Sequence, residues 1–326
     1  MGHIPSPVAR HGQLRVEGSR VLDAHGKAVQ LRGMSFYWSC LKGGWEFWNA
    51  DVVNWLADDW QISIVRAAMG VEDFGGYLDG DTPGSGRSNK DHLFDLVDAA
   101  IAKGIYVIID WHSHNAHLYT NEAKAFFEEM ALKYKSVPNV LYGIYNEPLG
   151  PLEESPGYAW DTDIKPYSQT IVDAIRAIDP DNIIIVGTPC WSQAVDTATD
   201  DPVEGKNLMY ALHFYAASEF HKQELRDKGI AALNNGKAVI VSEFGTCNHD
   251  GDVPYDFDEA DIWLDFLDQN KISWCNWSVH DLSEAASILM PGASKNGNWT
   301  DEDLTESGRY IRNRLITYSP IGFCAR

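Results

Sequence analysis

Eight short segments rich in β-branched and aromatic residues alternate along this chain with longer segments in which apolar residues recur at a helical period. The strand-like segments lie at 29–34, 62–67, 105–111, 140–145, 183–187, 208–214, 238–242 and 272–279. Helical patterns follow seven of them, at 52–59, 93–103, 122–134, 166–178, 219–234, 257–269 and 305–315. This repeated order predicts an α/β fold in which a parallel sheet closes into a (β/α)8 TIM barrel.

Two further segments complete the predicted architecture. Residues 188–207, after the fifth strand, lack a clear helical pattern, so we expect a short or irregular connection there. Residues 14–28 have the pattern of a small β-hairpin, which we expect to close the bottom, or N-terminal end, of the barrel. No linker, repeat or biased tract interrupts the chain, and residues 1–326 are therefore predicted to form a single catalytic domain.

Charge and composition narrow the possible partners. The chain has 26 basic and 47 acidic residues, a net charge of −21, which argues against nucleic acid or an anionic membrane as a partner. We find neither an apolar run long enough to span a bilayer nor a secretory signal in residues 1–13. The five cysteines form no C-x-x-C pair, which argues against a zinc ribbon or a redox motif.

Two glutamates stand out at the predicted strand ends, where barrel enzymes carry their chemistry. Glu147 follows the fourth strand and Glu243 the seventh, and these strands face one another across the barrel mouth. Glycoside hydrolysis needs one acid to protonate the leaving oxygen and one carboxylate at the anomeric carbon. A lone strand-end glutamate is usually only a solvated side chain, but two on opposing strands, among polar and aromatic residues, favour a glycosidase.

Other polar residues at strand ends can support such a pair. Arg66 and Tyr215 can hydrogen-bond a nucleophilic carboxylate and keep it ionised. His112 and His213 can orient the pair or bind sugar hydroxyls, although a single strand-end histidine is more often structural. Asn146 is suited to hydrogen-bonding a sugar 2-hydroxyl.

Aromatic residues crowd the loops after these strands, where glucose rings can stack on them. Trp45 follows the first strand, Tyr77 the second, Trp191 the fifth, and Trp277 ends the eighth. Core packing is the commoner role of a single tryptophan. Several together in surface loops favour a sugar-binding groove.

Residues 140–149, VLYGIYNEPL, resemble the signature of glycoside hydrolase family 5, whose Asn-Glu-Pro ends the fourth strand of a TIM barrel. Residues 65–69, 110–112, 185–193, 212–215 and 274–278 resemble further blocks of its bacterial-type endo-β-1,4-glucanase (cellulase) subfamily, subfamily 2. The resemblance extends from about residue 14 to residue 315.

The resemblance implies specific roles. It makes Glu147 the acid/base and Glu243 the nucleophile of a retaining, double-displacement mechanism that cleaves internal β-1,4-glucosidic bonds without a cofactor or metal. The family's other active-site positions are matched by Arg66, His112, Asn146, His213 and Tyr215. The residues expected to bind substrate are Tyr37, Trp45, Tyr77, Trp191, Trp277 and Glu284.

Three positions depart from the pattern of many relatives. Phe244 replaces a tryptophan after the nucleophile, and Tyr37 lies near a position that often holds histidine. Leu282 stands where many relatives have a lysine that contacts substrate. We therefore expect some sugar contacts to be weaker or replaced.

Alternative functions stay open at this point. A β-mannanase or mixed-linkage glucanase would use the same scaffold. A metal-dependent amidohydrolase could use His112, His114 and His213 as ligands. Such an enzyme requires a lysine after the fourth strand, however, where this chain has Glu147. A non-catalytic glycan-binding barrel would not need both carboxylates.

The expected substrate also predicts the enzyme's surroundings. β-1,4-Glucan polysaccharides are too large to enter a cell, so we expect an extracellular, secreted enzyme that acts on the polymer and on cello-oligosaccharides. We expect it to be a monomer.

Overall fold

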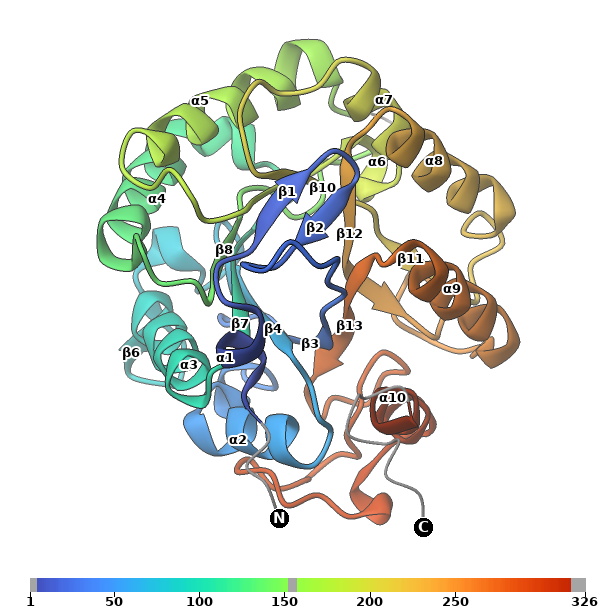
Figure 1. Ribbon diagram of the computed structural model, residues 1–326. Coiled ribbons are helices and arrows are strands. Elements are labelled where there is room, and N and C mark those ends of the chain that lie inside the picture. The colour runs from blue at the N-terminus through green and yellow to red at the C-terminus, as the bar shows by residue number, and fades with distance from the viewer. Residues whose placement is uncertain (1–4, 152–156, 318–326) are drawn as a thin grey trace.

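A closed ring of parallel strands forms the centre of the molecule (Figure 1). The computed structural model describes residues 5–151 and 157–317. In order around the ring, the strands are β3 (Arg32–Phe36), β4 (Ile64–Gly70), β7 (Tyr106–His112), β8 (Val140–Gly143), β9 (Ile184–Val186), β10 (Leu208–Ala211), β12 (Ala238–Gly245) and β13 (Ser273–Val279). Parallel pairing of β10 with β12 closes the ring. The predicted (β/α)8 barrel is therefore confirmed.

Helices cover the outside of the ring (Figure 1). The main ones are α2 (Ala50–Asp58), α3 (Asn89–Lys103), α4 (Thr120–Tyr134), α5 (Lys165–Arg176), α8 (Gln223–Asn234), α9 (Phe257–Asn270) and α10 (Glu306–Thr317). The connection after β9 carries only the short helices α6 (Pro189–Ser192) and α7 (Val195–Asp200), as its missing helical pattern predicted.

Local sequence sets the ends of these helices, as α3 shows. The Ser88 hydroxyl accepts a hydrogen bond from the backbone N–H of Asp91, whose carboxylate accepts one in return from the backbone N–H of Ser88. This capping box starts the helix. Gly104 ends it in the left-handed conformation, at φ 76°. The intervening apolar residues can then pack against the sheet.

A two-stranded hairpin lies across the centre of the ring in Figure 1. It consists of β1 (Arg15–Glu17) and β2 (Arg20–Leu22), and it follows the short helix α1 (Pro7–His11). Leu14 and Val21 are buried in one cluster with inward-facing strand residues such as Ile64 and Ile108. The hairpin therefore closes the N-terminal end of the barrel as predicted.

The predicted sixth strand, 208–214, is divided in two. Strand β10 ends at Ala211, and β11 (Phe214–Tyr215) resumes the pairing with β12. Between them the backbone N–H of His213 donates to the carbonyl of Ser192 in α6. The predicted fourth strand likewise ends early, at Gly143 instead of Tyr145. Both strands thus give way to irregular backbone just before the polar residues at the mouth.

Two negative findings apply to the described residues. No helix within residues 5–151 or 157–317 combines the length and the apolar character that crossing a bilayer requires. Over the same residues, Cys40, Cys190, Cys247 and Cys275 are all free thiols.

Candidate active site

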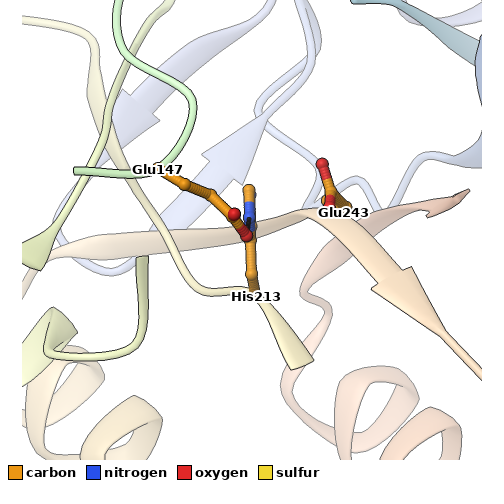
Figure 2. Close-up of side chains that lie close together, drawn as sticks. All are labelled: Glu147, His213 and Glu243. Atoms are coloured by element: carbon orange, nitrogen blue, oxygen red, sulfur yellow. Dashed lines mark hydrogen bonds and ion pairs between the residues drawn. The ribbon is translucent and has the colours of Figure 1, made fainter. Parts of the chain in front are cut away.

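Glu147 and Glu243 meet at the C-terminal mouth of the barrel. Glu147 comes four residues after Gly143, the last residue of β8, and Glu243 lies in β12. One carboxylate oxygen of each glutamate and one ring nitrogen of His213 all lie within 4.8 Å of one another. Figure 2 shows His213 beside the carboxylate of Glu147, with Glu243 next to them. The sequence prediction that these two carboxylates share one site is therefore consistent with the geometry.

A β-bulge in β12 directs Glu243 into the mouth. Val239, Val241 and Phe244 of this strand pack in the outer core, between the sheet and the helices. Strict alternation from Val241 would point residue 243 outward as well. The pairing of β12 with β13 shifts register between Val241 and Phe244, which places two successive residues on the inner side. Glu243 thereby faces the barrel mouth and Phe244 returns to the core.

Both oxygens of Glu243 accept hydrogen bonds. Nη1 of Arg66 lies 2.6 Å from Oε2, and the hydroxyl of Tyr215 donates to Oε1 at 2.7 Å. Burial and the nearby negative charges of Glu243 and Glu147 raise the pKa of Tyr215 well above its ordinary value, so its hydroxyl keeps the proton that it donates. A cation and a neutral donor together stabilise an anionic Glu243.

Arg66 links Glu243 to the neighbouring strand β7. Its side chain is 1% exposed, and its Nη2 lies 2.9 Å from Oδ2 of Asp110. The same Asp110 oxygen lies 2.8 Å from Nδ1 of His112. Because an ionised carboxylate only accepts, His112 donates from Nδ1, and its Nε2 is left without a proton in the neutral ring. Burial lowers the pKa of His112, which favours this neutral form.

Glu147 lies between two imidazoles. Nδ1 of His213 is 2.8 Å from its Oε1, and Nε2 of His114 is 3.4 Å from its Oε2. Burial alone would raise the pKa of Glu147, but the hydrogen bonds from His114 and His213 outweigh it and lower that pKa. Burial would likewise lower the pKa of His114, but Glu147 raises it. Glu147 and His114 therefore compete for one proton.

The amide of Asn146 is oriented by Arg66. Its Oδ1 accepts a hydrogen bond from Nη2 of Arg66. The backbone carbonyl of Asn146 accepts another from the hydroxyl of Ser192, at 2.8 Å. Because Oδ1 is occupied, the NH2 group is the part of the side chain that can donate to a ligand hydroxyl.

Four predicted sugar-binding residues lie near these groups or contact their neighbours. The ring of Trp277 stacks on His112, with centroids 5.1 Å apart, and Tyr37 lies 5.5 Å from Trp277. Glu284 is 2.8 Å from Nε2 of His280, on which Tyr37 stacks. Trp191 lines a cavity of about 650 Å³ that also contains Glu147.

The other two predicted sugar-binding residues make packing contacts. Trp45 stacks on His92 of α3, with centroids 5.8 Å apart. Tyr77 packs edge-to-face against Trp111 and Phe126, each at 5.4 Å. Contact of Trp45 and Tyr77 with a sugar stays a prediction.

Sequence reasoning did not assign Asp110, His114 or Glu72 to the glycosidase site. Asp110 begins the Asp-Trp-His block, and its place before His112 was the available signal. The sequence suggests a role for His114 only as a metal ligand. Glu72 accepts hydrogen bonds from the hydroxyl of Ser113 and from the backbone N–H of His114, so it holds the loop that carries His114. Nothing in the sequence distinguished Glu72 from other surface carboxylates.

The donor set does not suit a metal ion. Among residues 5–151 and 157–317, the one group of three candidate ligands is Glu147, His213 and Glu243. Both oxygens of Glu243 are already hydrogen-bonded, one of them to a guanidinium that would repel a cation. His112 and His114 do not belong to that group. The described residues therefore give the amidohydrolase alternative no ligand set.

Comparison with known proteins places this chain in a family. Residues 22–283 match the family model described as "Cellulase (glycosyl hydrolase family 5)". The chain belongs to glycosyl hydrolase family 5. Endoglucanase Z of Dickeya dadantii is 48% identical over 94% of this chain, and Endoglucanase 5 of Pectobacterium carotovorum is 42% identical over 97%. The chain spans 66% and 60% of the lengths of these two relatives.

Two solved structures have the same fold. A Cytophaga hutchinsonii structure has a TM-score of 0.88 and 46% identity, covering 95% of this chain and 96% of that one. The catalytic domain of a Thermobifida fusca endoglucanase, in a variant bound to cellotetraose, has a TM-score of 0.85 and 35% identity, covering 95% of this chain and 99% of that one.

Proposed function

We propose that this family 5 chain is an endo-acting, retaining β-1,4-glucanase, a cellulase, with Glu147 as acid/base and Glu243 as nucleophile. The observation that carries this proposal is a short distance between the two carboxylates: one oxygen of Glu147 lies within 4.8 Å of one oxygen of Glu243. Retaining glycosidases place their carboxyl groups about 5–5.5 Å apart, whereas inverting enzymes need roughly 6.5–9.5 Å to admit a water.

In the first step, protonated Glu147 gives its proton to the glycosidic oxygen while an oxygen of Glu243 attacks the anomeric carbon. The leaving sugar departs with that proton, and a covalent glycosyl-enzyme forms at Glu243. Arg66 and Tyr215 hold Glu243 in place for the attack. The hydrogen bonds from His213 and His114 stabilise the carboxylate that Glu147 becomes.

In the second step, the carboxylate of Glu147 takes a proton from water, and the resulting hydroxide attacks the anomeric carbon on the face that the leaving group vacated. Glu243 is released and the product keeps its β configuration. The NH2 group of Asn146, oriented by Arg66, donates to the sugar 2-hydroxyl, an interaction that strengthens in the transition state.

Azide rescue tests the two roles. With an aryl β-cellobioside, Glu147→Ala should still form the glycosyl-enzyme, and azide should then yield the β-cellobiosyl azide. Glu243→Ala should yield the α-azide, because azide displaces the aryl group directly. NMR of the products distinguishes the anomers. Glu128→Gln, on the exposed face of α4, is the control and should behave as the wild type. The same anomer from both alanine variants would contradict the assignment.

The relatives' names support β-1,4-glucan as the substrate. Endoglucanase Z and Endoglucanase 5 are named as endoglucanases, and the Thermobifida fusca structure holds cellotetraose. β-Mannan, which differs in the orientation of the C2 hydroxyl, and mixed-linkage glucan are the alternatives. Initial rates on carboxymethylcellulose, barley β-glucan and galactomannan decide between them, and a preference for galactomannan would overturn the cellulase assignment.

We further propose a secreted monomer that needs no metal for catalysis. A polymeric substrate requires an enzyme outside the cell, and the groups that the mechanism uses are all side chains of this chain. Activity should survive exhaustive chelation, and analytical ultracentrifugation should give a single species near 36.4 kDa.

A further inference from the structure

Phe220 exposes its ring from a loop that is otherwise well anchored. The loop joins β11 to α8, and the Phe220 side chain is 73% exposed. Two residues before it, Ser218 is buried, and its backbone N–H donates to the carbonyl of Tyr215. One residue after it, His221 is buried, and its Nδ1 accepts the backbone N–H of Tyr215 at 2.9 Å. An apolar ring is thus held in solvent by a loop that has little freedom to withdraw it.

The same ring lines the cavity that contains Glu147. This cavity, of about 650 Å³, is bordered by Glu147, Trp191, Phe220 and His249 among others. Its volume lies within the roughly 300–1,000 Å³ of typical ligand sites. A lone exposed apolar side chain needs no explanation, but one that lines the same cavity as the candidate acid does.

The position of the acid tells which part of a substrate this cavity holds. The acid must lie beside the glycosidic oxygen on the side of the leaving sugar. The cavity is lined by Glu147 and by its two hydrogen-bond partners, His114 and His213. Glu243 and the stacked rings of Tyr37, His112 and Trp277 are not among its lining residues. The cavity is therefore the leaving-group side of the groove.

We infer that Phe220 is a binding platform for a leaving-group sugar beyond the cleavage point and that it sets the enzyme's preference for longer glucans. The inference rests on the proposed function. A pyranose presents C–H groups on its faces, which stack on an aromatic ring without any charge on the protein. Phe220 offers such a ring, and the anchored loop holds it ready for the sugar at little cost in entropy.

Substrates of different leaving-group length test this role. In Phe220→Ala, kcat/KM on cellopentaose should fall about fivefold to tenfold, the effect of one lost ring contact. On 4-nitrophenyl β-cellobioside, whose leaving group has a single ring, the loss should be clearly smaller. Phe220→Trp should restore activity on cellopentaose. Phe74→Ala, which removes another exposed ring (81% exposed) after β4, is the matched control and should show no dependence on leaving-group length.

The outcomes separate the inference from the function on which it rests. Equal losses on the two substrates, or no loss on either, would overturn the role of Phe220. The melting temperature of Phe220→Ala should equal that of the wild type, which shows that the fold is intact in the comparison. A wild-type protein that hydrolyses no glucan would overturn the proposed function itself.

Discussion

The hydroxyl of Tyr215 is one of two donors to Glu243, at 2.7 Å from Oε1. A hydrogen bond to a charged group contributes about 1.5–3 kcal/mol, so Tyr215→Phe should lower kcat on an aryl cellobioside by roughly 10- to 100-fold. Steady-state rates measure this. Tyr310→Phe is the matched control, because Tyr310 also donates to a carboxylate, that of Asp261, but does so on the outer helices. Equal losses in the two variants would contradict a role through Glu243.

His114 should control the alkaline limb of the pH profile. Because its pKa is raised above the ordinary 6.5, the proton that it shares with Glu147 leaves the wild-type pair only above that pH. In His114→Gln only Glu147 can hold that proton. The pKa of Glu147 stays low in this variant, because the hydrogen bond from His213 remains. The alkaline limb of kcat/KM should therefore move to lower pH. Glu72 and Glu243 also face His114 and stay in place in the variant.

The shifted pKa values of His114 and Glu147 also make the stability of the protein depend on pH. The raised pKa of His114 gives a stabilisation that is lost as pH rises through its folded-state value. The lowered pKa of Glu147 gives one that is lost only as pH falls below its ordinary range. His114→Gln should thus cost the most stability at mildly acidic pH. An alkaline limb that does not move would contradict the shared proton.

Position along a strand predicted which polar residues lie together at the barrel mouth, whereas residue type did not predict which way the aromatic rings turn. Glu147, Glu243 and Arg66 lie together because parallel strands all end at one face. Trp45 and Tyr77 share the loop position of Trp191 but pack against α3 and α4, since a loop sequence does not tell which way a ring turns. The roles of Asp110, His114 and Glu72 became clear only from their contacts.

The hairpin is expected to contribute stability and not catalysis, because it covers the end of the barrel opposite the candidate site. Leu14, beside the hairpin, is 2% exposed. Leu14→Ala should lower the free energy of unfolding by about 2–5 kcal/mol, the usual cost of emptying a buried leucine site, while kcat stays unchanged. Urea denaturation and initial rates measure the two quantities. Leu132→Ala, at a leucine 60% exposed on α4, should change neither.

Short runs of β-branched and aromatic residues predicted all eight barrel strands, but they did not predict the bulge and the break in these strands. Each predicted strand overlaps an observed one, because burial on both faces requires a continuous apolar run. The bulge at Glu243 and the break at His213 have no periodic signal. They depend on pairing with neighbours far along the chain, such as β13 for Glu243 and α6 for His213.

The net charge of −21 creates a negative electrostatic field around the whole molecule, and this field acts on charged substrates. The proposed substrate, a neutral glucan, has no net electrostatic interaction with this field. Carboxymethylcellulose carries negative groups on the same backbone, so it is repelled by an acidic protein at low ionic strength. Repulsion of this kind extends about 30 Å at 0.01 M salt and about 8 Å at 0.15 M.

Salt should therefore improve binding of the charged polymer alone. Between 0.01 M and 0.15 M sodium chloride, we expect KM for carboxymethylcellulose to fall about twofold to fivefold as the repulsion is screened. KM for neutral barley β-glucan should change much less. The kcat should be nearly constant for both polymers, because the hydrogen bonds to Glu243 are buried and those to Glu147 are partly buried, which limits screening by salt. Initial rates at fixed pH measure both constants. An equal fall in KM for the two polymers would show that salt acts on the protein itself, and a rise for carboxymethylcellulose would mean that local positive charge in the groove outweighs the acidic surface.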